Sequence, residues 1–429
     1  MVAVGRSDGS VFIVKLGDSY LTLFMPVPKL LVVEGEEDDD DVSVRVDQKW
    51  MDSDELKKSL QDEPPQGIGD RTTQTQSPFE ISYQFQASEQ GEAINKLVYQ
   101  DNIEGSGGVI CSAAGNLGDI SMWKVIDKQI IQSAVLSGVH RGPIVALETL
   151  VIKDKNVLFS ASQDGSFALW NIDKNGELVT SHHCMDANSG SPIPLSCADV
   201  YNPSSLDDGY GNNDNDNNVI FLASPDGYVM GYVIQESPAG DISFNPGPNM
   251  RYKAHETAVT AIKCGGEGTI PASARLRQSD DSQANTSPRV SSSILITGGE
   301  DGSVKQWEIL SQKDQSSTGV RLEHWPILST QRMKRRAHLF SPSHDGAVTC
   351  ISQQSVNDPS KFLTASEDGS VSVWSTTSGK ELFTMDGFNK LSSLVFIGRE
   401  ILVTDGMEQY VCVHDFGIPE DADGYDLNW

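Results

Sequence analysis

The sequence of 429 residues contains 60 acidic and 32 basic side chains, which gives a formal net charge of −28 at pH 7. Such an excess of acid disfavours direct binding to nucleic acid through the phosphate backbone. A basic protein partner is easier to accommodate, because the summed charge of the chain attracts it.

The placement of the cysteines and the hydropathy of the sequence argue against metal-binding, disulfide-rich and membrane-spanning proteins. The six cysteines lie far apart and form no C-x-x-C pair, so the sequence indicates neither a zinc site nor a disulfide framework. No apolar run approaches the roughly 18 residues needed to cross a bilayer, and the start lacks the pattern of a signal peptide. We therefore expect an intracellular protein, cytoplasmic or nuclear, without membrane contact. The sequence leaves open whether an organelle-targeting segment lies upstream of Met1.

The first predicted element is a hairpin over residues 1–16, where apolar residues alternate on both sides of Asp8-Gly9. Residues 18–78 follow and are rich in Pro, Gln, Thr and charge, which predicts a disordered insertion. Its acidic run, EGEEDDDD, suits either a solvated loop or a docking site for a basic partner. Residues 79–87 alternate again and predict an outer strand.

Six further hairpins follow along the chain, and a polar segment separates each of two of them from the inner strand before it. The hairpins are predicted over residues 109–125, 158–171, 219–234, 295–308, 362–375 and 401–416. The segments 204–218 and 266–292 are rich in Ser, Asn, Asp and Gln and predict two more disordered insertions.

One of these insertions resembles a calcium-binding loop at first sight. Asp214, Asp216 and Asn218 stand at alternate positions, as in such a loop. The glycine at the sixth position and the bidentate glutamate at the twelfth are missing, however. We therefore expect a polar loop and neither a metal ion nor another cofactor.

Three of the hairpins share one spacing. In residues 158–171, 295–308 and 362–375 a corner Asp is followed by Trp six residues later. A His lies 24 residues before the Asp in the first and third cases and 46 before it in the second, which implies an insertion of 22 residues. Three hairpins with one spacing predict a repeat architecture.

This pattern resembles the WD-repeat family of β-propellers, whose repeat forms one four-stranded blade. The resemblance implies a buried hydrogen-bond chain in each repeat: Asp accepts from His, His contacts a Ser or Thr hydroxyl, and the hydroxyl meets the Trp indole N–H. The implied sets are His140, Ser160 (or Ser162), Asp164 and Trp170; His255, Thr297, Asp301 and Trp307; and His344, Thr364, Asp368 and Trp374.

A Ser/His/Asp trio is also the machinery of many hydrolases. Here the trio occurs three times at a repeat period, and a hydrolase would also need an oxyanion hole and a nucleophile in a cleft. We therefore predict structural sets, no catalytic residues and no enzyme activity.

The resemblance implies an all-β fold, a seven-bladed propeller of four-stranded antiparallel blades in a single domain over residues 1–416. Its corners fall at residues 8, near 118, 164, 226, 301, 368 and 408. Because the first hairpin starts at the second strand of its blade, the first blade is expected to be incomplete at the N-terminus. Residues 417–429 form an acidic tail.

The resemblance implies a non-catalytic scaffold that assembles other proteins on the propeller surface, as a monomer within a larger complex. The binding face cannot be assigned from the sequence. An alternative is a substrate-recruiting subunit of a cullin-type ubiquitin ligase, whose members often carry Trp-Asp-x-Arg. The matching positions 170–173, 307–310 and 374–377 all lack the Arg. The one dense basic cluster, Lys334 to Arg336, suits either an exposed loop or a nuclear import signal.

Overall fold

The computed structural model describes residues 2–16, 79–201, 218–268, 292–325, 344–353, 361–397 and 401–415, apart from short gaps inside these ranges. This part of the chain contains strands and turns but no helix, so the prediction of an all-β chain is confirmed for it. Outside the described residues lie the predicted insertion 18–78, nearly all of 204–218, most of 266–292, the corner positions Asp8 and Glu408, the basic cluster 334–336 and the tail 417–429.

The described strands form seven antiparallel sheets, numbered here in chain order. Sheet 1 holds β1 (Val2–Gly5), β2 (Ser10–Leu16) and β3 (Phe79–Gln86). Sheet 2 holds β4 (Ile94–Asp101), β5 (Gly108–Ala114), β6 (Ile120–Ile126) and β7 (Gln129–Leu136). Sheet 3 holds β8 (Ile144–Ile152), β9 (Lys155–Ser162), β10 (Ser166–Asn171) and β11 (Glu177–His183).

The remaining sheets come from the second half of the chain. Sheet 4 holds β12 (Cys197–Tyr201), β13 (Val219–Ala223), β14 (Tyr228–Glu236), β15 (Ile242–Phe244) and β16 (Met250–Lys253). Sheet 5 holds β17 (Val259–Gly268), β18 (Ser292–Gly299), β19 (Val304–Asp314) and β20 (Ser317–Trp325). Sheet 6 holds β21 (Val348–Gln353), β22 (Lys361–Ser366), β23 (Ser370–Ser375) and β24 (Glu381–Asp386). Sheet 7 holds β25 (Leu394–Ile397), β26 (Ile401–Met407) and β27 (Tyr410–Asp415).

Sheets 2, 3, 5 and 6 have the four strands that the repeat predicts, whereas sheets 1 and 7 have three. Sheet 4 departs from four strands, because β14 pairs with β15 at one end and with β16 at the other. Two short strands therefore share its outer position. Pro246 and Pro248 lie between them and lack the N–H that a continuous outer strand would need. Strand β17 also extends to Gly268, into the segment predicted as an insertion from residue 266.

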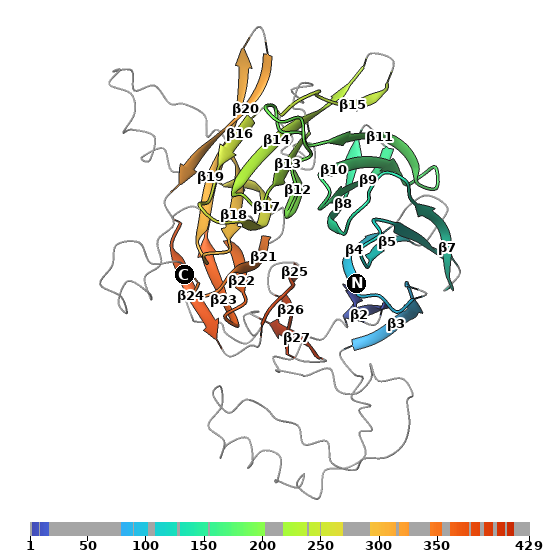
Figure 1. The fold of residues 1–429 in the computed structure, drawn as a ribbon. Helices are drawn as coiled ribbons and strands as arrows, with labels where there is room; N and C mark the ends of the chain where they lie inside the picture. Colours follow the sequence, from blue (N-terminus) through green and yellow to red (C-terminus); the bar gives the residue numbers. More distant parts are fainter. Residues whose placement is uncertain are drawn as a thin grey trace, which may run out of the picture.

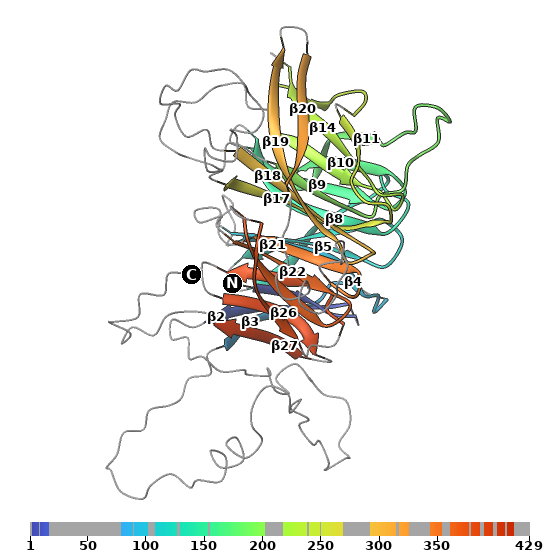
Figure 2. The same ribbon diagram turned by 90° about the vertical axis from the view of Figure 1, so that its left-hand side faces the viewer.

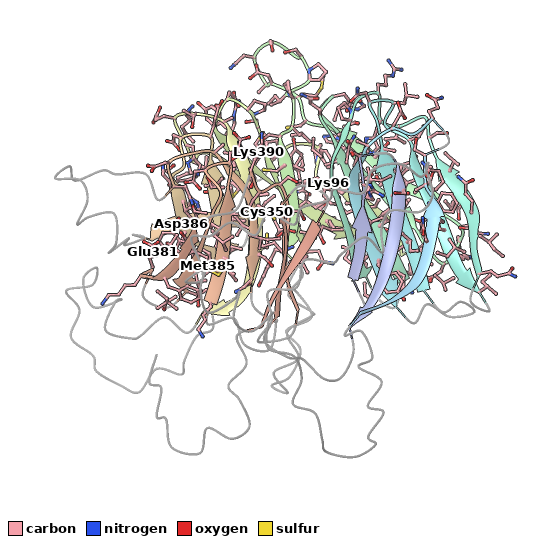
Figure 3. All side chains as sticks on the ribbon, turned by 90° about the horizontal axis from the view of Figure 1, so that it is seen from below. Lys96, Cys350, Glu381, Met385, Asp386 and Lys390 are labelled. Carbon is pink, nitrogen blue, oxygen red and sulfur yellow. The ribbon has the colours of Figure 1, made fainter. Side chains whose placement is uncertain are left out.

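The sheets follow one another around a ring, with sheet 1 in blue and sheet 7 in red at its lower side (Figure 1). Their first strands, β4, β8, β12, β17, β21 and β25, contact one another in succession and form the inside of the ring. Figure 2 shows the same sheets from the side, stacked one after another. In Figure 3, Lys96 and Cys350 of inner strands lie near the middle, and Glu381 and Asp386 of the outer strand β24 lie to one side.

The core consists of apolar clusters between consecutive sheets rather than one central mass. One cluster joins sheets 2 and 3, others join 3 to 4, 4 to 5, 5 to 6 and 6 to 7. A middle strand such as β10 is therefore buried at every position, because neighbouring sheets cover both of its faces. The Trp residues of the repeats pack into these layers against the preceding sheet, as Trp374 does against Ile294 and Ile296.

Candidate functional site: the buried hydrogen-bond chains

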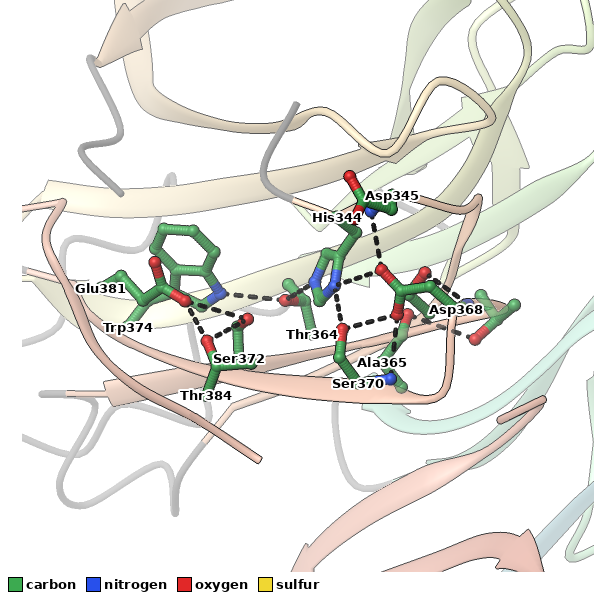
Figure 4. Close-up of polar contacts among 12 residues, drawn as sticks. His344, Asp345, Thr364, Ala365, Asp368, Ser370, Ser372, Trp374, Glu381 and Thr384 are labelled. Atoms are coloured by element: carbon green, nitrogen blue, oxygen red, sulfur yellow. Dashed lines mark hydrogen bonds and ion pairs between the residues drawn. The ribbon is translucent and has the colours of Figure 1, made fainter. Parts of the chain in front are cut away.

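The residues singled out by the repeat meet inside sheets 3, 5 and 6, and sheet 6 shows the arrangement (Figure 4). The indole Nε1–H of Trp374 donates to Thr364 Oγ1 over 2.9 Å. That oxygen lies 2.6 Å from Nε2 of His344. On the other side of the ring, Nδ1 lies 2.8 Å from Ser370 Oγ, which donates to Asp368 Oδ1 over 2.5 Å. Five side chains thus form one continuous hydrogen-bond chain.

The direction of these hydrogen bonds assigns the tautomer of His344. Because the Ser370 hydroxyl gives its proton to a carboxylate, its oxygen accepts from Nδ1–H of the imidazole. The Nε2 atom then accepts from the Thr364 hydroxyl, whose oxygen accepts from the indole. All four donors point from Trp374 towards Asp368, and the histidine is neutral. Each buried polar group in this chain has a partner.

Sheets 3 and 5 contain the same chain. His140 lies 2.7 Å from Ser160 and 2.6 Å from Ser166, and Trp170 donates to Ser160 over 2.8 Å. In sheet 5 the corresponding residues are His255, Thr297, Ser303, Asp301 and Trp307, with distances of 2.6–3.0 Å. Of the two serines left open in sheet 3, Ser160 occupies the chain, whereas Ser162 donates to the carbonyl of Gly142.

A serine that sequence reasoning missed stands between His and Asp in every chain. The predicted direct bond from His to Asp is replaced by two bonds through this hydroxyl, and Asp368 Oδ2 stays 3.8 Å from His344 Nδ1. The three serines are Ser166, Ser303 and Ser370. A signal was present, because all three corners read Asp-Gly-Ser.

The corner aspartates also hold backbone. Asp368 accepts from the N–H of Ser370 and, through Oδ2, from the N–H of Asp345, which follows His344. In sheet 3, Asp164 accepts from the N–H of Arg141 in the same way. Each of these carboxylates therefore ties the corner of its hairpin to the loop that carries the histidine.

Burial and hydrogen bonding set the charges of the chain. Burial lowers the pKa of His140 to about 4, against an opposing effect of the Asp164 charge. This value agrees with a neutral imidazole at physiological pH. Burial alone would raise the pKa of Asp368, but the Ser370 hydroxyl and the Asp345 N–H bring it below its usual value. The chain is therefore built from neutral groups that end on one carboxylate.

A corner glycine of each preceding sheet presses against the backbone of the histidine. Gly118, Gly227 and Gly302 have φ of +82°, +85° and +75°, a region that glycine adopts without strain. A Cβ atom at these positions would overlap the backbone of His140, His255 and His344 respectively. The N–H of His344 donates to the carbonyl of Gly302 over 3.0 Å, and that of His255 to Gly227 over 3.1 Å. Glycine is required there both for the turn and for the close approach.

Sheets 2 and 4 depart from this pattern. In sheet 2, Trp123 donates to Ser112 over 3.0 Å, without an upstream histidine. In sheet 4, Tyr232 takes the Trp position and its hydroxyl donates to Cys184 Sγ over 3.6 Å, while Cys184 lies 3.3 Å from Met230 Sδ. Burial raises the pKa of both Cys184 and Tyr232. Sheet 4 is thus filled by aromatic and sulfur groups.

A second polar group, on the inner strands, was also missed. Lys263 Nζ lies 3.0 Å from Asp199 Oδ1 and 3.4 Å from Glu148 Oε1, so one ammonium joins sheets 5, 4 and 3. Asp199 is buried and also accepts from the N–H of Cys264. A signal existed: Glu148 and Lys263 both stand four residues after the β-branched residue that opens their strands.

The charges of this inner-strand cluster, Glu148, Asp199 and Lys263, depend on one another. Burial lowers the pKa of Lys263, but the charges of Asp199 and Glu148 outweigh it and raise the pKa overall. Burial raises the pKa of Glu148, against the attraction of Lys263. An ion pair on the inside of the ring therefore connects three consecutive sheets.

The described residues lack the features of two other classes of site. No group of three or more His, Cys, Asp or Glu side chains in the described ranges is arranged to hold a metal ion. Within those same ranges, no helix has the length and hydropathy to span a bilayer.

Comparisons with known proteins agree with the repeat. Residues 247–308 and 336–375 match the family described as WD domain, G-beta repeat. No curated protein matches the chain. Among solved structures, the computationally designed Ika8 protein is similar with a TM-score of 0.41 and 17% sequence identity, over 78% of this chain and 87% of that chain. The two matched segments include the hairpins of sheets 5 and 6, and they show that these parts of the chain carry WD repeats.

Proposed function

We propose that this protein is a non-catalytic platform that binds other proteins on the surface of a seven-bladed propeller. WD repeats generally indicate a scaffold for protein interactions rather than an enzyme. The observation that carries the proposal is the use of the Ser, His and Asp groups inside sheets 3, 5 and 6. These groups form hydrogen bonds with one another inside the sheets, so they stabilise the fold. Partner proteins would therefore be bound by other residues, on the outer surfaces.

The domain organisation is part of this proposal. Residues 1–416 are proposed to form one propeller whose seven blades are the seven sheets, with sheet 1 lacking the innermost strand. The contact of β1 with β4 supports this, because in other sheets the second strand contacts the first strand of the next, as β5 contacts β8 and β18 contacts β21. A single cooperative calorimetric transition is expected, and two separable transitions would contradict one domain.

The partner is proposed to be a different protein with a basic surface. The net charge of −28 opposes association of two copies and attracts positive charge. A role in a ubiquitin ligase is less well supported, because the Arg of the Trp-Asp-x-Arg pattern is missing at all three matching positions.

The test is purification of the chain, tagged at its natural locus, followed by light scattering after gel filtration and mass spectrometry of the peak. The expected result is a mass above that of one chain, with a stoichiometric basic partner that dissociates as salt is raised. A chain that elutes alone at the mass of one copy at physiological salt overturns the proposal.

A further inference from the structure

Strand β7 forms an open edge at the outside of sheet 2. The strand order of this sheet is β4-β5-β6-β7, and no described strand pairs with the far side of β7. An outer strand presents a row of N–H and C=O groups that a further strand can pair with. The outer side of β7, Gln129 to Leu136, therefore offers backbone groups in two regular stretches, 129–132 and 134–136, on either side of a bulge at Ser133.

The side chains of β7 do not protect this edge. Its sequence, QIIQSAVL, contains no charged residue, although edge strands usually carry charges that discourage pairing with other chains. The other outer strands of six or more described residues do carry charges, namely Glu80 in β3, Glu177 in β11, Arg321 and Glu323 in β20, and Glu381 and Asp386 in β24.

Sheet 2 has exposed apolar side chains on β7 and near it. Ile131 and Val135 of β7 are 48% and 52% exposed, and they lie on opposite faces of the sheet because a bulge at Ser133 shifts the register between them. Ile126 at the end of β6 is 37% exposed, and Leu117 in the turn before β6 is 63% exposed. These are four of the eleven large apolar side chains found exposed in the described part of the chain, and they are concentrated in one sheet. A strand laid on β7 would cover apolar surface as well as backbone groups.

The sheet behind this edge is well packed. Leu136 is buried and pairs with buried Ile120, and Ala134 pairs with buried Met122. These side chains belong to the cluster between sheets 2 and 3. The edge is therefore held in an extended shape before any partner arrives, which lowers the entropy cost of binding.

Charge decides between the possible occupants. A second copy would bring another net charge of −28, so self-association through β7 is opposed. The exposed carboxylate of Asp119 immediately precedes β6, beside the Leu136 end of β7. An uncharged strand that continues into basic residues at that end is complementary to both features.

We propose that an extended segment of a basic partner protein adds to β7 as a fifth strand of sheet 2. The segment carries uncharged residues along the strand, with one apolar side chain against Ile131 on one face of the sheet and another against Val135 on the other face, and Lys or Arg beyond the end beside Asp119. This rests on the proposed function as a platform and names one surface that carries it out.

A defined peptide tests the edge in the full-length protein. The probe is a seven-residue peptide of Val and Thr that presents Val on both faces of the strand, with two lysines at each end, and the matched probe carries glutamates instead. Hydrogen exchange of the amides of β7 is expected to slow by about tenfold with the lysine peptide, which corresponds to about 1.4 kcal/mol. Equal protection by the glutamate peptide, or none by either, overturns the proposal.

Variants separate this edge from the rest of the surface. Ile131→Lys together with Val135→Lys places charges on β7 at exposed positions and is expected to abolish the protection. Leu178→Lys on β11 is the matched control, because Leu178 is 43% exposed on another outer strand. It is expected to leave the protection unchanged. Loss in the control, or protection that survives in the double variant with an unchanged melting temperature, contradicts the proposal.

The natural partner is identified by a photo-crosslinking amino acid at position 135, with position 178 as the control. A crosslink from 135 to an uncharged, basic-flanked segment of another protein supports the proposal. A crosslink to β7 of a second copy, or none, overturns it. If stoichiometric partners still bind the double lysine variant, β7 is not the binding site, but the proposal of a binding platform holds. If the unaltered chain has no partners, the platform itself fails.

Discussion

Sheets 6 and 4 reach the same antiparallel geometry with different interiors. Sheet 6 contains a polar chain from Trp374 to Asp368, whereas sheet 4 places Tyr232 against Cys184 and Met230. Phe167 of sheet 3 packs in a tilted arrangement against both Tyr232 and Phe244, at 4.9 and 4.8 Å between ring centroids. The chain of hydrogen bonds is therefore not needed to form a sheet. The chain also fixes the corner of the hairpin and the loop that carries the histidine, because Asp368 accepts hydrogen bonds from the N–H groups of Ser370 and Asp345.

The largest expected effect is the loss of a chain's tryptophan. Trp374→Ala removes a fully buried indole and leaves Thr364 without its donor, and we expect the free energy of unfolding to fall by about 3–5 kcal/mol. Urea denaturation measures the change.

Two milder substitutions compare the sheets directly. Trp374→Phe keeps an aromatic ring but loses the N–H donor, for an expected cost of about 1–3 kcal/mol. Tyr232→Phe loses only the contact of a hydroxyl with sulfur, for an expected cost below about 1 kcal/mol. Equal costs would show that the two interiors do not differ in the way described.

Acid is expected to destabilise the sheets that contain a chain. The pKa of His140 falls from 6.5 in the unfolded state to about 4 in the folded state, so the unfolded state takes up the proton first. Stability is therefore lost as pH falls from 6.5 towards 4, by about 3 kcal/mol for this residue. Hydrogen exchange should quicken in sheet 3 more than in sheet 4 over this range. An equal increase of hydrogen exchange in both sheets would contradict the role of His140 in this loss of stability.

A further loss of stability follows at lower pH. The pKa values of Asp164, Asp301 and Asp368 lie below the usual value, because hydrogen bonds outweigh the effect of burial. Their contribution is present above the unfolded pKa and disappears as pH falls through the folded pKa.

The serine and the aspartate of a chain should act as one unit. Asp301→Ala and Ser303→Ala each remove the bond between the exposed carboxylate of Asp301 and the partly buried hydroxyl of Ser303, for about 1 kcal/mol each. The double variant should cost less than the sum, because one bond is counted twice. Thermal and urea unfolding of the three variants give the coupling energy, and strict additivity would exclude the serine from the chain.

A modest effect is expected for the inner-strand cluster. Lys263→Met leaves Asp199 buried without its ammonium, and because Lys263 is partly exposed to solvent we expect about 1–2 kcal/mol. Since this cluster ties sheet 4 to both neighbours, the loss should appear as faster hydrogen exchange in β12. Unchanged exchange in β12 would remove the cluster as a stabiliser of sheet 4.

The sequence predicted the corners and the repeat because each depends on neighbouring residues. Asp-Gly corners followed by Trp six residues later can be read within one hairpin. The divided outer strand of sheet 4 was less visible, because its two pieces are short and lie on either side of Pro246 and Pro248. The match to the repeat family falls on residues 247–308 and 336–375, where these hairpins are most regular.

Of the two candidate sites, the hydrogen-bond chains were largely predicted from the sequence, whereas the inner-strand cluster was not. The four residue types of each chain followed from the resemblance, but the bridging serine did not, because Asp-Gly-Ser also reads as an ordinary turn. The inner-strand cluster joins residues 64 and 115 positions apart. Its formation depends on which sheets become neighbours in the ring, and the matching positions of Glu148 and Lys263 in their strands do not contain that information.

The corner glycines give the ring a direction. Gly227 belongs to sheet 4, which has no hydrogen-bond chain of its own, yet it positions His255 in sheet 5. A sheet can therefore exchange its interior freely while its corner remains constrained by the sheet that follows. Damage at one corner therefore reaches the next repeat as well as its own turn, so the order of the chain is also an order in which the sheets depend on one another.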